Sequence, residues 1–133
     1  MPVRVATGSN PYITDFRVER YTPPYLIGDN AKRRPTKINI STKTLAPNQV
    51  FTVKFDAPAT AKGVKIVLYY GGFVTHSVHM GHRMLELEVA PLSFKPGQTT
   101  QNVSAKTPPN KNICPPGPYV LYVVVCIKKV TKL

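Results

Sequence analysis

Three histidines and one methionine fall within the short segment 74–83, and they are the side chains of this chain best suited to bind a metal ion. They are His76, His79, Met80 and His82. A neutral imidazole offers a nitrogen ligand to transition metals, and copper accepts imidazole readily. Apolar runs that are predicted to be strands flank the segment, so its histidines are expected at a strand end. The sequence therefore predicts a β-domain that carries metal ligands and could be only part of an enzyme.

The spacing of the histidines leaves more than one interpretation open. On an ideal strand His76 and His82 share one face while His79 points to the other, because side chains alternate. A tight turn at Gly81 would bring the imidazoles and Met80 together in a weak, adventitious copper or zinc site. The alternative for His76 is a loop histidine bonded to backbone or water. One imidazole cannot hold copper alone, because affinity needs several ligands in a fixed geometry.

Short apolar runs separated by turn residues predict an all-β sandwich from residue 36 onward. Alternation in 51–55 and in 85–89 predicts strands with one buried face, and 103–105 is expected to form a weaker strand. The run 119–127 is apolar almost throughout, which is typical of a central strand covered on both faces. The 14 prolines leave little room for helices longer than a turn or two.

Length and cysteine content bound the class of protein. At 133 residues the chain has the size of one domain with one core. Cys114 and Cys126 stand at opposite ends of the predicted strand 119–127, too far apart to form a disulfide. No export signal follows Met1, and no apolar run is long enough to span a membrane. Hydrolase and phosphate-binding motifs are also absent from the sequence.

The charge is strongly basic, with 18 Lys and Arg against 6 Asp and Glu and a formal net charge of +12. Such a surface attracts anionic partners without a specific site. A local cluster is formed by Lys32, Arg33 and Arg34, but no aromatic residues are interleaved with it as in a base-stacking platform. The composition therefore predicts no specific nucleic-acid binding, and it leaves an acidic polysaccharide as a possible partner.

Several motifs occur in an order that resembles the C-terminal part of glyoxal oxidase and galactose oxidase, the copper-radical oxidases. The resemblance extends over nearly the whole chain, up to about Val125. Each motif is weak by itself, but together and in the same order they are fairly specific. The motifs are Gly8-Ser9-Asn10-Pro11, Glu19 with Pro23-Pro24-Tyr25-Leu26, Arg34-Pro35, Thr75-His76-Ser77-Val78 with Arg83, and Pro115-Pro116-Gly117-Pro118-Tyr119-Val120-Leu121-Tyr122-Val123.

The resemblance implies an architecture and a metal ligand. In that family a kelch propeller precedes an immunoglobulin-like sandwich, the early set domain, and one loop of the sandwich delivers a histidine to copper at the propeller axis. The matching residue here is His76. The other copper ligands and a crosslinked cysteine–tyrosine radical cofactor come from the propeller, so the resemblance implies copper as cofactor and a propeller as partner. Complete family members are extracellular and oxidise an alcohol or aldehyde with O₂, giving H₂O₂; this chain alone is expected to be inactive.

The resemblance also divides the chain and shows where it departs from the family. Residues 1–35 are expected to be an extended segment, in which 4–11 resembles the end of the last propeller blade and a linker follows. Residues 36–133 form the early-set sandwich, with 126–133 replacing the final strand, so an open sheet edge is expected. His79 and His82 replace other polar residues of the family and are not implied as ligands, and Arg83 matches a basic residue with no assigned role. The alternatives are a stand-alone basic sandwich that binds acidic polysaccharide, or a fragment with no independent role.

Overall fold

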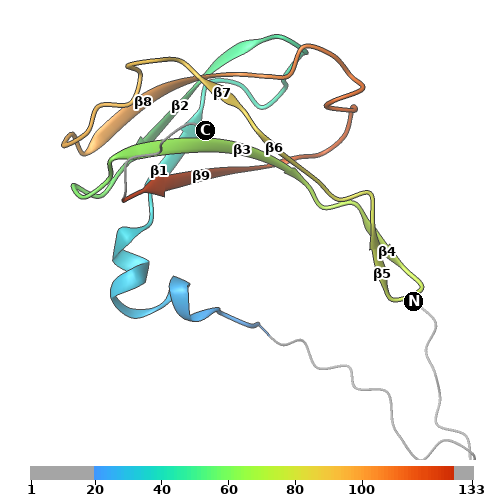
Figure 1. The fold of residues 1–133 in the computed structure, drawn as a ribbon, viewed down its shortest axis with the longest axis horizontal. Helices are drawn as coiled ribbons and strands as arrows, with labels where there is room; N and C mark the ends of the chain where they lie inside the picture. The colour runs from blue at the N-terminus through green and yellow to red at the C-terminus, as the bar shows by residue number, and fades with distance from the viewer. Residues whose placement is uncertain (1–19, 128–133) are drawn as a thin grey trace, which may run out of the picture.

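The computed structural model describes residues 20–127, which form two facing antiparallel sheets with one hairpin extending from their end (Figure 1). The first sheet has the strand order β1-β2-β8-β7, and these strands are Thr36–Ile40, Val50–Asp56, Thr100–Lys106 and Glu88–Val89. The second has the order β6-β3-β9, formed by Arg83–Glu86, Gly63–Tyr70 and Val120–Cys126. The hairpin consists of β4, Phe73–Thr75, and β5, Val78–Met80. The prediction of an all-β, immunoglobulin-like sandwich is confirmed.

The N-terminal part of the described chain differs from the extended segment that the sequence predicts. It contains two 3-10 helices, η1 (Pro24–Leu26) and η2 (Gly28–Arg33), neither of which has a buried residue. No helix within residues 20–127 is long and apolar enough to cross a membrane. The expectations for segment 4–11 and for the altered terminal strand at 128–133 concern residues outside those that the structure describes.

The core lies between the two sheets and is built by strand alternation. In β2, Val53 and Phe55 are completely buried, while Lys54 between them is exposed. Ile66 and Leu68 of β3 pack from the opposite sheet into the same cluster. Successive side chains of a strand point to opposite faces, so this alternation is what a half-buried strand requires. The predicted strand with one buried face at 51–55 is therefore confirmed.

The strand predicted at 103–105 is present as part of the longer β8, which is a central strand and not a weak one. It lies between β2 and β7 and is paired with β2 along its whole length, from Val50↔Lys106 to Asp56↔Thr100. Its inward residues are buried, and one of them is the glutamine Gln101. A buried glutamine and a small alanine give little hydropathic signal, and for that reason the pattern underestimates the strand.

Strand β9 does not have the central position that its apolar sequence predicts. Within residues 20–127 it pairs only with β3 and forms the edge of its sheet. The side chains of Val120, Tyr122 and Val124 are 52%, 51% and 45% exposed on the outer face. Apolar side chains on both faces of a strand are typical of a covered strand, but no second layer covers the outer face within the described chain.

The segment 85–89 alternates as predicted, yet it belongs to two different sheets. β6 pairs with β3, while β7 pairs with β8 in the opposite sheet. The chain crosses between the sheets at the buried Leu87, whose N–H donates to the carbonyl oxygen of Ile66 at 2.8 Å. This bond ties the crossing to β3.

Cys114 and Cys126 are both free, which confirms that they form no disulfide with each other.

Candidate metal-ligand site

The hairpin that carries the first histidine is a continuation of β3 and β6. Pairing between these strands ends at Tyr70↔Arg83, and pairing between β4 and β5 begins at Phe73↔Met80. Two residues on each side of the ladder are unpaired between these two points. The break changes the direction of the ladder, and Figure 1 shows β4 and β5 projecting beyond the end of the sandwich.

Glycines make this break possible. Gly72 has a φ of +62°, and a Cβ atom added to it would overlap the carbonyl oxygen of Met80. Gly81, on the other side of the ladder, has a φ of +72°. Left-handed backbone is accessible to glycine at no steric cost, whereas other residues are strained there. The two backbones can therefore approach each other only because position 72 lacks a side chain.

His76 lies at the outermost turn of the hairpin in a conformation that is uncommon for histidine. Thr75 and Val78 form the last pair of the ladder, and the two residues between them, His76 and Ser77, have φ angles of 52° and 61°. Positive φ at both central positions defines a type I′ turn, for which Asn-Gly is the preferred sequence. The sequence His-Ser therefore makes this turn less stable than Asn-Gly would. Residues in strained backbone conformations of this kind cluster at functional sites.

The imidazole of His76 is exposed and has one ring nitrogen engaged. Its Nδ1 lies 2.9 Å from Oγ1 of Thr75, which orients the ring. Metal-binding histidines are typically oriented in this way through the nitrogen that does not bind the metal. Nε2 is thus the ring nitrogen that the Thr75 contact leaves available. The imidazole of His76 is exposed and is not packed under the sheets. A side chain has to be exposed in this way to reach another domain.

The other two histidines come together at the base of the hairpin, without His76. His79 lies on β5 and His82 follows the Gly81 bend, and their ring centroids are 4.9 Å apart. Residues 20–127 contain no group of three or more His, Cys, Asp or Glu side chains that could hold a metal ion. Of the two interpretations of the spacing, the turn at Gly81 therefore applies, but it brings together two of the three imidazoles and not all three.

Arg83 has a structural role that sequence reasoning missed. Its Nη1 donates to the carbonyl oxygens of Asn112 and Ile113, at 3.0 and 2.7 Å. These bonds tie the loop between β8 and β9 to the start of β6, directly below the hairpin. No local signal could have revealed them, because the acceptors are backbone groups about thirty positions further along the chain.

The same loop is held by Tyr119, whose hydroxyl donates to the carbonyl oxygen of Pro115 at 2.9 Å. Burial and the nearby Cys114 raise the pKa of Tyr119 to about 12, so the phenol remains a hydrogen-bond donor even at about pH 10, where an ordinary tyrosine ionises. Its ring packs against Tyr70 at the end of β3, with centroids 5.5 Å apart. The base of the hairpin is therefore supported from the loop side by an aromatic pair and by the Arg83 bonds.

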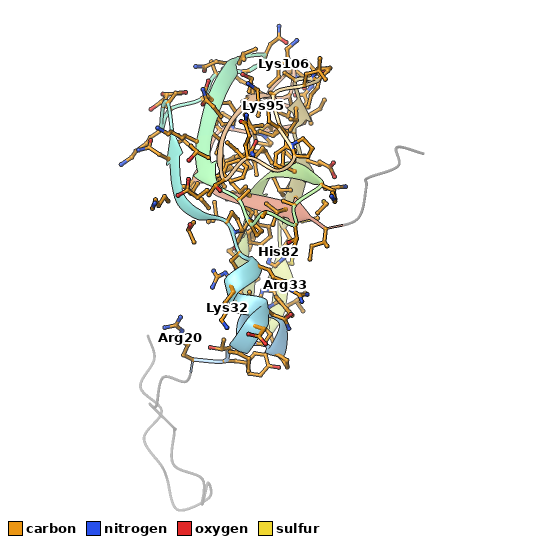
Figure 2. The ribbon with its side chains drawn as sticks, turned by 90° about the vertical axis from the view of Figure 1, so that its left-hand side faces the viewer. Arg20, Lys32, Arg33, His82, Lys95 and Lys106 are labelled. Atoms are coloured by element: carbon orange, nitrogen blue, oxygen red, sulfur yellow. The ribbon has the colours of Figure 1, made fainter. Side chains whose placement is uncertain are left out.

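The basic side chains do not gather into one site. Figure 2 shows Arg20, Lys32 and Arg33 at one end of the molecule and Lys95 and Lys106 at the other. Lys32 is also paired with Asp29 at 2.8 Å. Dispersed exposed charges attract polyanions through the overall field, so the distribution gives no support to a specific polysaccharide site around Lys32, Arg33 and Arg34.

A Ser77→Gly substitution is expected to stabilise the hairpin. Glycine removes a left-handed strain of about 1–2 kcal/mol and loses about 0.5–1 kcal/mol to its greater freedom in the unfolded chain, so the net gain is on the order of 0.5 kcal/mol. Amide exchange of β4 and β5 measures it. Ser77→Ala is the matched control, because it removes the same hydroxyl but keeps the Cβ. Equal protection in the two variants would contradict the strained-turn interpretation.

Comparison with known proteins places this arrangement in a family. The profile of the family described as "Galactose oxidase-like, Early set domain" matches residues 34–131. Aldehyde oxidase GLOX1 of Arabidopsis thaliana is 33% identical over 117 residues, which are 85% of this chain and 19% of that protein. Aldehyde oxidase GLOX of Vitis pseudoreticulata is 29% identical over 127 residues, covering 88% of this chain and 24% of that protein.

The chain thus spans only about a fifth to a quarter of the length of these curated relatives. No solved structure matches it significantly. The family match covers most of the chain and includes the sandwich and the projecting hairpin, so the chain belongs to the galactose oxidase-like early set domain family.

Proposed function

We propose that this chain is the early-set domain of a copper-radical oxidase and that His76 is its contribution to the copper site. The observation that carries the proposal is the position of His76: an exposed imidazole in a strained type I′ turn, at the tip of a hairpin that projects from the sandwich.

The surface of the hairpin supports a role as an insert into another domain. Phe73, Val74 and Val78 are 57%, 62% and 55% exposed, although all three are apolar. Small hairpins of this kind are marginal in water by themselves, and exposed apolar patches mark interaction sites. A surrounding domain that covers the hairpin would bury these side chains and hold the imidazole in one place. The kelch propeller of the copper-radical oxidases is the partner that we infer.

His76 fits copper as one ligand of several. Its Thr75 contact fixes the ring and leaves Nε2 to donate, which is the ligand type that copper prefers. The remaining ligands and the radical cofactor would come from the propeller, since the described residues hold no further cluster around His76. Bound copper, with that cofactor, would supply the oxidation of an alcohol or aldehyde and the reduction of O₂ to H₂O₂.

The role of the sandwich in this reaction is positional. Arg83 and Tyr119 fix the base of the hairpin, the glycine break at Gly72 sets its direction, and the turn sets the orientation of His76. We place the domain boundary near residue 35, so that 36–133 form the sandwich and 1–35 connect it to the propeller. This division follows the start of β1 at Thr36.

The test compares the chain alone with the chain joined to the propeller of a related aldehyde oxidase. The chain alone, supplied with Cu(II), is expected to form no H₂O₂ from glyoxal or galactose, because it provides one ligand. The joined protein is expected to be active, and His76→Gln should remove both its activity and its copper spectrum. Ser77→Ala in the same turn is the control and should retain both. Turnover by the isolated chain, or a joined His76→Gln protein that keeps its copper, would refute the proposal.

A further inference from the structure

His79 and His82 are separated in sequence by Met80 and Gly81 and yet lie side by side in space. Their ring centroids are 4.9 Å apart, with an angle of 52° between the ring planes, and both side chains are exposed. A regular strand would place residues three positions apart on opposite faces. The left-handed conformation of Gly81, with a φ of +72°, bends the chain so that the two imidazoles meet.

The separation of the two rings is the one that a shared metal ion requires. With a metal–nitrogen distance of about 2.1 Å and tetrahedral geometry, two imidazole ligands hold their ring centres about 5 Å apart. The pair has this spacing already.

His82 is also oriented in the way that metal-binding histidines are. Its Nδ1 lies 3.4 Å from the hydroxyl of Tyr69, and the two rings meet edge to face with centroids 5.7 Å apart. A hydrogen-bonding group on one ring nitrogen fixes the tautomer and the orientation of the ring and leaves the other nitrogen for the metal. Tyr69 thus has the position of a supporting residue, and Nε2 of His82 is the available ligand atom.

We propose that His79 and His82 form a surface site for one divalent transition-metal ion, separate from His76. Two neutral imidazoles favour Cu(II), Ni(II) and Zn(II) over Mg²⁺ and Ca²⁺, and Cu(II) binds most tightly in the general order of affinities. No third His, Cys, Asp or Glu joins the pair within residues 20–127, so water completes the coordination and affinity stays below that of a three-ligand site. The site does not depend on the proposed oxidase function.

The test is a titration of the complete, tag-free chain with Zn(II) chloride, followed by calorimetry and by the NMR signals of the imidazole rings. One equivalent is expected to bind and to shift the rings of His79 and His82. His79→Gln and His82→Gln should each weaken binding by at least about tenfold, since even the loss of a supporting partner of a ligand has that effect. His76→Gln is the matched control and should leave the affinity unchanged. The same titration with Mg²⁺ should show no binding.

Other outcomes overturn the inference. The inference is wrong if His79→Gln and His82→Gln both keep the affinity of the unmodified chain. It is also wrong if only His76→Gln loses binding, or if zinc does not shift the signals of the two rings in the unmodified chain. Because all three histidines are exposed, the variants are expected to fold, and their circular dichroism verifies this. The result also separates the two sites: His76→Gln decides the oxidase proposal in the joined protein, whereas His79→Gln and His82→Gln decide this one.

Discussion

A Gly72→Ala variant is expected to lose the β4–β5 hairpin while the sandwich stays folded. The new methyl group would occupy the position of the Met80 carbonyl oxygen, and backbone atoms cannot give way as the end of a flexible side chain can. The φ of +62° adds about 1–2 kcal/mol of left-handed strain. The only relief is separation of the two backbones. Amide exchange should show loss of protection in 73–80 and retained protection in β2, β3 and β8.

Gly28→Ala is the matched control for this experiment. Gly28 in η2 has nearly the same φ, +59°, but nothing lies within 4 Å of the Cβ position. Its substitution therefore measures the left-handed strain alone, about 1–2 kcal/mol, and should leave the hairpin protected. If both variants kept a protected hairpin, the close approach at Gly72 would not be what shapes the ladder. In the joined oxidase, Gly72→Ala should also displace His76 and lower the copper content.

The fold was predictable where strand alternation coincides with large apolar residues. Phe51, Val53 and Phe55 alone specify the buried face of β2, and the sequence places that strand correctly. The sequence-based prediction of the strand's position fails for β9, because hydropathy reports the composition of a strand and not which elements cover it. Tyr122 and Val124 are apolar but half exposed, since the outer face of their sheet has no second layer within the described residues.

The candidate site was predictable only in part. The resemblance singled out His76, and the structure puts that residue on an exposed turn, but its strained conformation could not be read from the sequence. The contact between His79 and His82 depends on the conformation of Gly81. The sequence offered both a turn there and regular strand alternation, and residue types alone do not decide between the two. The role of Arg83 depends on distant backbone carbonyls. These features come from tertiary geometry, which residue types and spacing do not encode locally.

A buried polar side chain, missed by hydropathy, is predicted to have one of the largest effects on stability. Gln101 is 1% exposed and faces the core side of β8. Its Nε2 donates to the carbonyl oxygens of Lys95 and Gln98 at 2.8 and 2.6 Å, and its Oε1 accepts from the N–H of Lys95 at 2.9 Å. One side chain thus satisfies three backbone groups of the loop that precedes β8. The amide of Gln101 is itself buried and needs these partners, whereas Lys95 and Gln98 are exposed residues of the loop.

A Gln101→Met variant is therefore expected to lose on the order of 3 kcal/mol of the free energy of unfolding, because three hydrogen bonds are lost and each contributes about 1 kcal/mol net. Methionine keeps the length and most of the volume of glutamine, so the change reports the three hydrogen bonds and not a cavity. Urea denaturation measures it as a lower midpoint. Asn102→Ala, at the exposed next position of the same strand, is the control and should stay within about 0.5 kcal/mol of the parent. Similar midpoints for the two variants would mean that the backbone groups of the loop form other hydrogen bonds when Gln101 is replaced, and that Gln101 does not stabilise the loop.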